Sequence, residues 1–276
     1  SGDAYYKFVN TTNFTLTIKT LIALNITYPD GHAFLQGAKV PFIGYVYDDC
    51  SGVPGATVTF KDNFGASWYD CSPVSDQQNG TYNCTFDTSG RPFGWHNIKM
   101  TAKKQYYDNY PTPTETLKTN AYFIASKPSL SNPSVDHTLG GWGELYTFSV
   151  QLTDTDKNLN NVSLWKSFDQ INWVLVDSKI VQPTYSNYPV SFQKRFTCED
   201  YLNATDGINY WKIITIDEYG YSDETSILNF TLDVDNVTLS IGSDSSTSVR
   251  RIGDNTAYFR FLIYDTDKGE YVSNAN

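Results

Sequence analysis

Two strand-like patterns recur along this chain at a common spacing. The first has a phenylalanine six positions before an aspartate and an aliphatic residue two positions before it, and it ends at Asp48, Asp154 and Asp265. Successive copies of this aspartate are 106 and 111 residues apart. Because side chains along a strand alternate with a period of two, the phenylalanine and the aliphatic residue share one face. The pattern predicts three copies of one half-buried strand.

The second pattern lies elsewhere in the chain and keeps the same period. Asn13–Ile18 matches Asn229–Val234 at a distance of 216 residues, and Asn120–Ala125 is a looser copy midway between them. Two unrelated strands that keep one period of about 108 residues predict a tandem array of one structural unit.

Composition indicates the class of this unit. Aromatic residues make up 16% of the chain, with 21 tyrosines, and they recur in short runs with threonine, valine and isoleucine. These residue types favour a pleated surface, and no segment shows the period of a helix. The chain is therefore expected to be all-β, in tandem immunoglobulin-like or fibronectin III-like β-sandwiches of about 100 residues each.

The phase of the repeat sets the expected domain boundaries. We expect residues 1–18 to be the last strand of a preceding domain, and residues 19–126 and 127–234 to be two complete sandwiches. Residues 235–276 would supply only the opening strands of a further domain. Two explanations remain open for the incomplete ends: a window onto a longer polypeptide, or completion of the sheet by a strand from a neighbouring chain.

Charge and hydropathy exclude two classes of partner. The chain has 30 acidic and 20 basic residues and a net charge of −10, with no long basic cluster. Binding to nucleic acid needs clustered lysine and arginine, so it is not expected. No apolar run approaches the roughly 20 residues that span a bilayer, so we expect no direct membrane span in this window.

Asparagine placement favours an extracellular location. Nine of the 22 asparagines lie in the acceptor pattern Asn-x-Ser/Thr, where about four would be expected by chance. The alternative is that polar β-proteins are simply rich in asparagine and threonine. The candidate N-glycosylation sites are Asn10, Asn13, Asn25, Asn79, Asn83, Asn161, Asn203, Asn229 and Asn236.

The four cysteines are consistent with an oxidising compartment. Cys71 and Cys84 are placed symmetrically about a turn-forming run, so they are expected to form a disulfide across a hairpin. Cys50 and Cys198 then either bridge two domains or stay unpaired. Metal binding is the rival reading, but the chain has no Cys-x-x-Cys pair.

Local motifs resemble the immunoglobulin-like and fibronectin III-like domains of archaeal and bacterial surface proteins. Gly52–Phe60 looks like the turn and strand of bacterial immunoglobulin-like repeats, with alanine, valine and phenylalanine alternating inward. Asn209–Asp217 is similar to the penultimate strand of fibronectin-like modules, which implies that Tyr210 and alternate aliphatic residues pack inward. Upstream, Ser167–Trp173 reads as a hairpin that places Trp173 in the core.

Together with Gly141–Glu144 and the density of acceptor asparagines, these motifs most resemble archaeal S-layer and related cell-surface proteins. The resemblance implies a non-enzymatic, glycosylated structural protein of the cell envelope. Its partners would be other copies of itself, in a layer or a surface filament, and its attached glycans. The alternatives are an adhesin or carbohydrate-binding module, and an accessory region of a secreted hydrolase.

No residues gather into a catalytic pattern. His32, His96 and His137 are scattered, and none accompanies a nucleophile elbow or a phosphate-binding loop. The chain is therefore expected not to be an enzyme, and no cofactor is expected except calcium.

Two ligand hypotheses remain. Alternating oxygen-bearing side chains at Asp154, Asp156 and Asn158, repeated at Asp265 and Asp267, resemble the opening of a calcium loop, and the alternative is an Asx-type turn between strands. Clusters of tyrosine at 106–110 and 185–188 would suit stacking on sugar rings, or packing against a neighbouring domain or chain.

Overall fold

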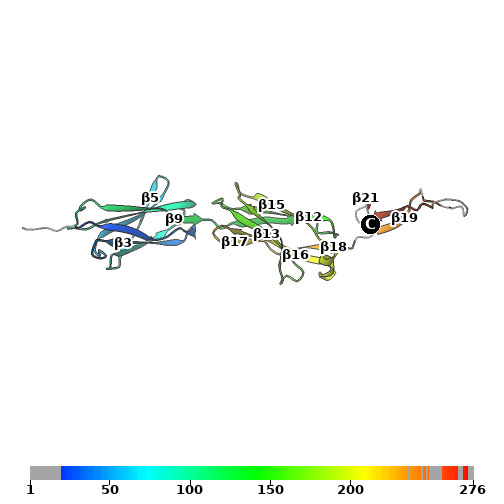
Figure 1. The fold of residues 1–276 in the computed structure, drawn as a ribbon, viewed down its shortest axis with the longest axis horizontal. Helices are drawn as coiled ribbons and strands as arrows, with labels where there is room; N and C mark the ends of the chain where they lie inside the picture. The colour runs from blue at the N-terminus through cyan, green and yellow to red at the C-terminus, as the bar shows by residue number, and fades with distance from the viewer. Residues whose placement is uncertain are drawn as a thin grey trace, which may run out of the picture. The chain divides into compact units, whose positions relative to one another are not determined.

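The computed structural model describes residues 20–234, 237–243, 245–246, 248, 257–266 and 270–272. The chain divides into two compact units, Ser1–Ser126 and Lys127–Asn276. Nearly all regular structure in the described residues is β-strand, which confirms the all-β prediction (Figure 1). The strand expected at residues 1–18 lies outside the described residues. No helix in the described part has the length and apolar character needed to cross a membrane.

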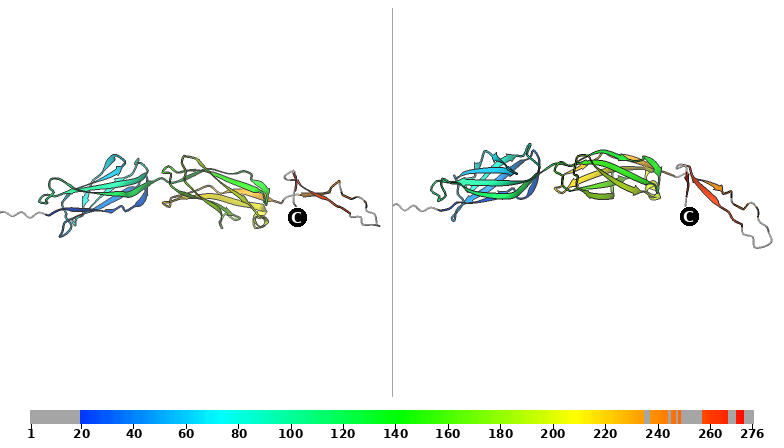
Figure 2. Two further views of the ribbon diagram at one scale, coloured as in Figure 1. Left: turned by 45° about the horizontal axis from the view of Figure 1, so that its top comes forward. Right: turned by 90° about the horizontal axis from the view of Figure 1, so that it is seen from above.

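The first unit is a sandwich of two sheets, with the orders β1-β3-β7-β6 and β2-β9-β8-β4-β5. Neighbouring strands are antiparallel except for β2 and β9, which are parallel. Figure 2 shows the strands of the unit as two facing layers. Their bounds are β1 Ala23–Tyr28, β2 His32–Leu35, β3 Lys39–Tyr47, β4 Thr57–Phe64, β5 Ser67–Cys71, β6 Ser75–Asp76, β7 Thr81–Asp87, β8 Gly94–Lys103 and β9 Thr114–Ala125.

Strand β3 shows why the repeated sequence pattern forms this structure. Phe42 and Val46 are completely buried on its inner face, as the alternation predicts. Between them, Gly44 makes room for the opposite sheet, because a Cβ atom there would lie 2.4 Å from the sulfur of Met100. After the strand, a carboxylate oxygen of Asp48 accepts hydrogen bonds from the backbone N–H groups of Cys50 and Ser51, both at 2.9 Å, and so caps the turn.

The structure confirms the Cys71–Cys84 disulfide but not its expected geometry. Cys71 ends β5 in one sheet and Cys84 lies on β7 in the other, so the bond joins the two layers of the sandwich. The expected hairpin partner of β7 is instead the short strand β6, because the chain crosses between the sheets after Cys71. Cys50 and Cys198 are exposed and free.

Removing this bond with Cys71→Ser/Cys84→Ser is expected to lower the free energy of unfolding of the first unit by about 2–4 kcal/mol, because the bond restricts the unfolded chain. Urea unfolding followed by tryptophan fluorescence measures the loss. The matched control, Cys50→Ser/Cys198→Ser, removes two exposed thiols and should change stability by less than about 0.5 kcal/mol. Equal losses in the two double variants would show that the disulfide does not stabilise the unit.

The second unit is also a sandwich of two sheets. One has the order β10-β12-β15, and the other has β11-β18-β16-β13-β14 with β17 paired to β16. A short helix and a 3-10 turn lie between β15 and β16. The bounds are β10 Ser129–Val135, β11 Leu139–Gly141, β12 Leu145–Thr153, β13 Asn160–Ser167, β14 Val174–Val181, β15 Tyr188–Arg195, α1 Cys198–Leu202, η1 Thr205–Gly207, β16 Ile208–Asp217, β17 Ser222–Glu224 and β18 Leu228–Asp233.

Two expectations about this core are wrong. Trp173 is only half-buried, and its indole N–H donates to the carbonyl oxygen of Gln170 at 3.2 Å at the end of a hairpin. The buried tryptophan is Trp211, whose ring centroid is 5.0 Å from that of Phe148 in the opposite sheet. Because Trp211 sets the inward phase of β16, its neighbour Tyr210 faces outward instead of packing in the core.

The described residues beyond the second sandwich form a small antiparallel sheet in the order β19-β20-β21. Phe259, the phenylalanine of the third pattern copy, precedes β20 and is exposed, whereas Asp265 at the end of β20 is buried. The bounds are β19 Val237–Ile241, β20 Phe261–Asp265 and β21 Glu270–Tyr271.

Candidate functional site

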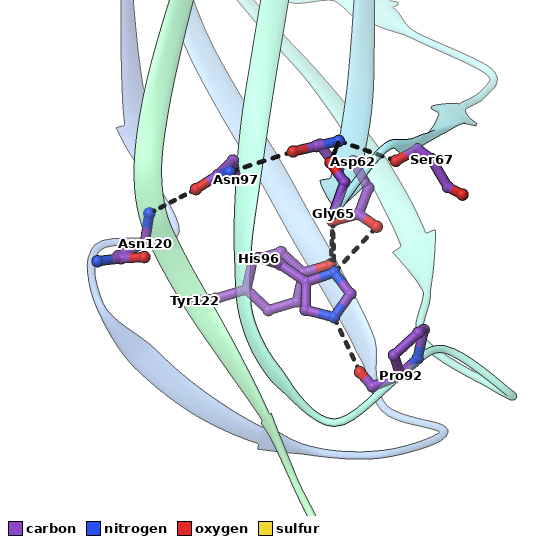
Figure 3. Close-up of polar contacts among 9 residues, drawn as sticks. Asp62, Gly65, Ser67, Pro92, His96, Asn97, Asn120 and Tyr122 are labelled. Atoms are coloured by element: carbon purple, nitrogen blue, oxygen red, sulfur yellow. Dashed lines mark hydrogen bonds and ion pairs between the residues drawn. The ribbon is translucent and has the colours of Figure 1, made fainter.

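A cluster of polar side chains is completely buried inside the first unit (Figure 3). Asp62 lies on β4, His96 on β8 and Tyr122 on β9, three adjacent strands of one sheet. Each is on the inward side of its strand, and the side chains of Asp62 and His96 are 0% exposed. The register pairs His96 with Tyr122 directly, and a bulge after His96 sets the strand phase there.

Hydrogen bonds connect the members of this cluster. The Nδ1 atom of His96 lies 2.9 and 3.0 Å from the two carboxylate oxygens of Asp62, and its Nε2 atom lies 2.9 Å from the carbonyl oxygen of Pro92. The hydroxyl of Tyr122 donates to the first of these oxygens at 2.8 Å. A carbonyl oxygen can only accept, so the Nε2 atom of His96 carries a proton. A second proton joins Nδ1 to the Asp62 carboxyl group, and the cluster is a buried, hydrogen-bonded Asp62–His96 pair.

Burial raises the pKa of the Tyr122 hydroxyl, and the neighbouring Asp62 carboxylate raises it further. Tyr122 therefore stays protonated and keeps its donated hydrogen bond. A catalytic group must reach a substrate atom within hydrogen-bond distance. Because all three side chains are enclosed by the sandwich, the cluster holds strands together and ties the Pro92 loop to the core.

A row of asparagines continues this network across the same strands (Figure 3). The amide of Asn97 donates to the side-chain oxygen of Asn63 at 3.1 Å, and the backbone N–H of Asn120 donates to Asn97 at 2.8 Å. Asn63 in turn donates to the carbonyl oxygens of Gly65 and Ser67, which closes the β4–β5 hairpin. The row is a structural brace across three strands.

Four of the five residues of the calcium hypothesis lie in the described part of the chain. Asp154 and Asn158 are buried in the β12–β13 loop, and the amide of Asn160 donates to a carboxylate oxygen of Asp154 at 2.6 Å. Asp156 lies in the same loop, Asp265 ends β20, and Asp267 lies outside the described residues. Calcium binding by these residues stays a prediction.

Among the described residues, a different set brings three potential ligand atoms within 4.8 Å of one another. It consists of Asp48, Asp49 and Cys50 in the exposed turn after β3. The carboxylate of Asp48 is already engaged, because it caps this turn and also accepts from the hydroxyl of Tyr107 at 2.9 Å. The set is therefore explained by the turn itself.

Close to the calcium-loop residues, acidic side chains act on Tyr219. Partial burial is the largest cause that raises the pKa of its hydroxyl to about 12, and the charges of Glu218, Asp156 and Asp217 add to it. An ordinary tyrosine has a pKa near 10. The hydroxyl of Tyr219 therefore stays neutral in the folded unit at pH values where it ionises in the unfolded chain.

This shift predicts a pH dependence for the second unit. The stabilisation from the protonated Tyr219 hydroxyl is fully present below about pH 10. It is lost as the pH rises toward about 12, because the unfolded chain releases this proton more readily than the folded unit does. Unfolding in urea between pH 9 and about 11.5 should show a steeper loss for the parent chain than for Tyr219→Phe. An identical dependence of unfolding free energy on pH in the two chains would contradict the raised pKa of Tyr219.

The tyrosine clusters are each divided between surface and core. Tyr106, Tyr110 and Tyr185 are exposed, whereas Tyr107 and Tyr188 pack against the cores of their units. The rings of Tyr185 and Tyr188 are 5.3 Å apart. Each cluster thus contains an exposed tyrosine close in sequence to a partly buried one, and in the second cluster the two rings are in contact.

The acceptor asparagines within the described residues lie on the surface. Asn83 is half-buried, and the others are exposed: Asn25, Asn79, Asn161, Asn203 and Asn229. Asn10, Asn13 and Asn236 lie outside the described residues. Five of the six described sites are thus exposed at the surface.

The strand orders and the two separate cores define this chain as a tandem of immunoglobulin-like β-sandwiches. No protein-family model matches the chain, and no curated protein sequence does either.

Solved structures with similar folds were found at low identity. A marsupial T cell receptor is 8% identical, with a TM-score of 0.47, and the match covers 92% of this chain and 98% of the receptor chain. A bacterial ice-binding adhesin is 14% identical, with a TM-score of 0.36 and coverage of 93% and 87%. For a DUF4785 family protein of Legionella pneumophila the identity is 11%, the TM-score is 0.37, and the match covers 76% of this chain and 55% of that one. These values carry no inference about function.

Proposed function

We propose that the chain belongs to a non-enzymatic extracellular structural protein, of the archaeal S-layer type, that assembles with copies of itself into a cell-envelope layer or a surface filament. The observation that carries this proposal is the succession of two sandwiches, each with its own aromatic core. Repetition of a self-contained unit builds length and surface area, as a structural array requires.

Two further observations support an extracellular site. The Cys71–Cys84 disulfide persists in oxidising compartments and is rare in the cytosol. Five of the six described acceptor asparagines are exposed, among them Asn161 on β13 and Asn229 on β18. Glycans at these positions would shield strand faces from unwanted pairing. Attached glycans are thus part of the proposal.

The test uses the cells that produce the protein. Intact cells are labelled with a membrane-impermeant biotin reagent, and thin sections are stained with a gold-conjugated antibody against this chain. The expected result is biotinylated protein and gold in a continuous layer or along filaments. Labelling only after lysis would overturn the extracellular proposal, and scattered gold that follows neither a continuous layer nor filaments would overturn assembly.

An adhesin or carbohydrate-binding module is the second candidate. The exposed rings of Tyr106 and Tyr185 favour it, because aromatic rings stack on the apolar faces of sugars. It predicts saturable binding by the isolated monomer on a glycan array, lost with Tyr106→Ala or Tyr185→Ala. Binding of no glycan by the parent chain would eliminate this candidate.

A further inference from the structure

Buried oxygen-bearing side chains gather at one end of the second unit. Asp154 and Asn158 lie in the loop between β12 and β13, and Asp217 is the last residue of β16. Their exposed fractions are only 4%, 5% and 5%. A carboxylate that folding removes from water is costly unless hydrogen-bond donors or a cation compensate its charge. What compensates Asp154 and Asp217 therefore decides what this end of the sandwich can bind.

Strand pairing brings Asp217 close to the loop. Asn160 on β13 is the direct partner of Asp217 on β16, and both residues are on the buried side of their strands. Side chains of such directly opposed residues are neighbours. The amide nitrogen of Asn160 also lies 2.6 Å from Oδ2 of Asp154, and 3.2 and 3.3 Å from the backbone and side-chain oxygens of Asn158. One buried side chain thus links Asp217 to the oxygens of the loop.

The two carboxylate oxygens of Asp217 have different surroundings. Oδ1 accepts hydrogen bonds from the backbone N–H groups of Tyr219 at 2.9 Å and Tyr221 at 2.7 Å, which shapes the turn after β16. Oδ2 is buried, and no donor among the described residues lies within hydrogen-bond distance of it. A buried acceptor without a donor is rare in folded proteins and indicates a bound ion, a water or a proton. The turn therefore accounts for Oδ1 and leaves Oδ2 for a ligand.

The chemistry of the nearby groups suits a hard divalent cation. Asp156 adds a third carboxylate from the same loop at a half-buried position, whereas Lys157, the basic residue of this loop, is exposed. The groups are carboxylates, a side-chain amide oxygen and a backbone carbonyl, without sulfur or imidazole. Calcium takes about six to eight oxygens of these kinds, whereas magnesium keeps most of its waters and uses one or two carboxylates. The set therefore favours calcium.

We propose that the second unit binds calcium at this end of its sandwich. Asp217 is the ligand from β16, and the loop between β12 and β13 supplies the others, Asp154, Asp156 and Asn158. Bound calcium would provide the counter-charge for Oδ2 of Asp217 and would tie the loop to the end of β16. Because the three carboxylates are not all within 4.8 Å of one another, calcium would draw the half-buried Asp156 towards the buried oxygens.

The experiment is isothermal titration calorimetry of the whole chain, treated with EGTA and dialysed, with calcium chloride up to about 10 mM at constant ionic strength. Calcium sites of extracellular modules have dissociation constants of about 0.1–1 mM, so this range reaches saturation. The test variants, Asp217→Asn and Asp156→Asn, each remove one negative charge and keep the size of the side chain. Asp48→Asn is the matched control, because Asp48 is the counterpart of Asp154 in the first unit and also accepts hydrogen bonds from backbone N–H groups of its turn.

The expected result is saturable binding by the parent chain, which each test variant weakens about tenfold or more and Asp48→Asn leaves unchanged. Calcium should also raise the melting temperature of the parent chain, because a ligand that binds only the folded state stabilises it. No heat and no melting shift up to about 10 mM would overturn the proposal and leave a proton on Asp217 as the compensation for its burial. Binding lost in Asp48→Asn and kept in both test variants would place calcium in the first unit and also overturn the proposal.

Magnesium chloride is the specificity control. Magnesium binding with the same affinity would indicate general attraction of cations to an acidic region and would overturn the calcium assignment. Melting curves in EGTA identify which variants are folded. If Asp217→Asn does not fold, Asp156→Asn against Asp48→Asn decides the proposal by the same criteria.

Discussion

Replacing Asp62 with alanine is expected to lower the free energy of unfolding of the first unit by about 3–5 kcal/mol, because it removes one partner of a buried pair and leaves the His96 ring without its hydrogen-bond partner. The His96 side chain is 0% exposed, so water cannot replace the lost carboxylate. Tyr122 also loses the acceptor for its buried hydroxyl. Urea unfolding at pH 7 measures the change.

Asp70→Ala is the matched control for this experiment. Asp70 lies on the neighbouring strand β5 and is also 2.9 Å from a cationic nitrogen, that of Lys61, but both of these side chains are largely exposed. Exposed ion pairs contribute about 0–1 kcal/mol. A loss for Asp62→Ala no larger than the loss for Asp70→Ala would contradict a stabilising role of the buried Asp62–His96 pair.

The second large effect concerns the two tryptophans whose roles the sequence did not separate. Trp211→Ala is expected to lower the free energy of unfolding of the second unit by about 3–5 kcal/mol, because it removes a fully buried ring from the centre of the core. Trp173→Ala should cost about 1 kcal/mol or less, the range of an exposed contact between a lysine and an aromatic ring. Chemical denaturation of the two variants under one set of conditions gives both values. Comparable losses of unfolding free energy in the two variants would indicate that Trp173 is packed in the core.

Inward alternation explains which parts of the fold were predictable. Phe42 and Val46, like Phe148 and Leu152, are buried where the repeat places them, because packing one face of a strand is a local demand that the sequence records directly. The pairing of strands within the sheets was less predictable. The Cys71–Cys84 bond was found from its symmetric spacing, but which sheet each cysteine joins depends on strand order, which spacing does not encode.

The buried Asp62–His96 pair is partly predictable from the same alternation. Asp62 stands between Phe60 and Phe64 in the inward phase of β4, a costly position for a lone carboxylate and therefore a sign of a buried partner. That the partner is His96 could not be read from the chain, since the two residues meet through the pairing of β4, β8 and β9. The expectation that Trp173 is buried was wrong for a related reason. Alternation indicates which residues share a face of a strand, but not where a hairpin extends beyond the core.

Differential scanning calorimetry of the intact chain tests most directly the claim that two self-contained sandwiches follow one another. We expect Asp62→Ala to lower the melting temperature of one transition and Trp211→Ala to lower that of another, with each leaving the other transition in place. If both variants displaced one and the same cooperative transition, the chain would have a single core, and the tandem array on which the proposed function depends would be wrong.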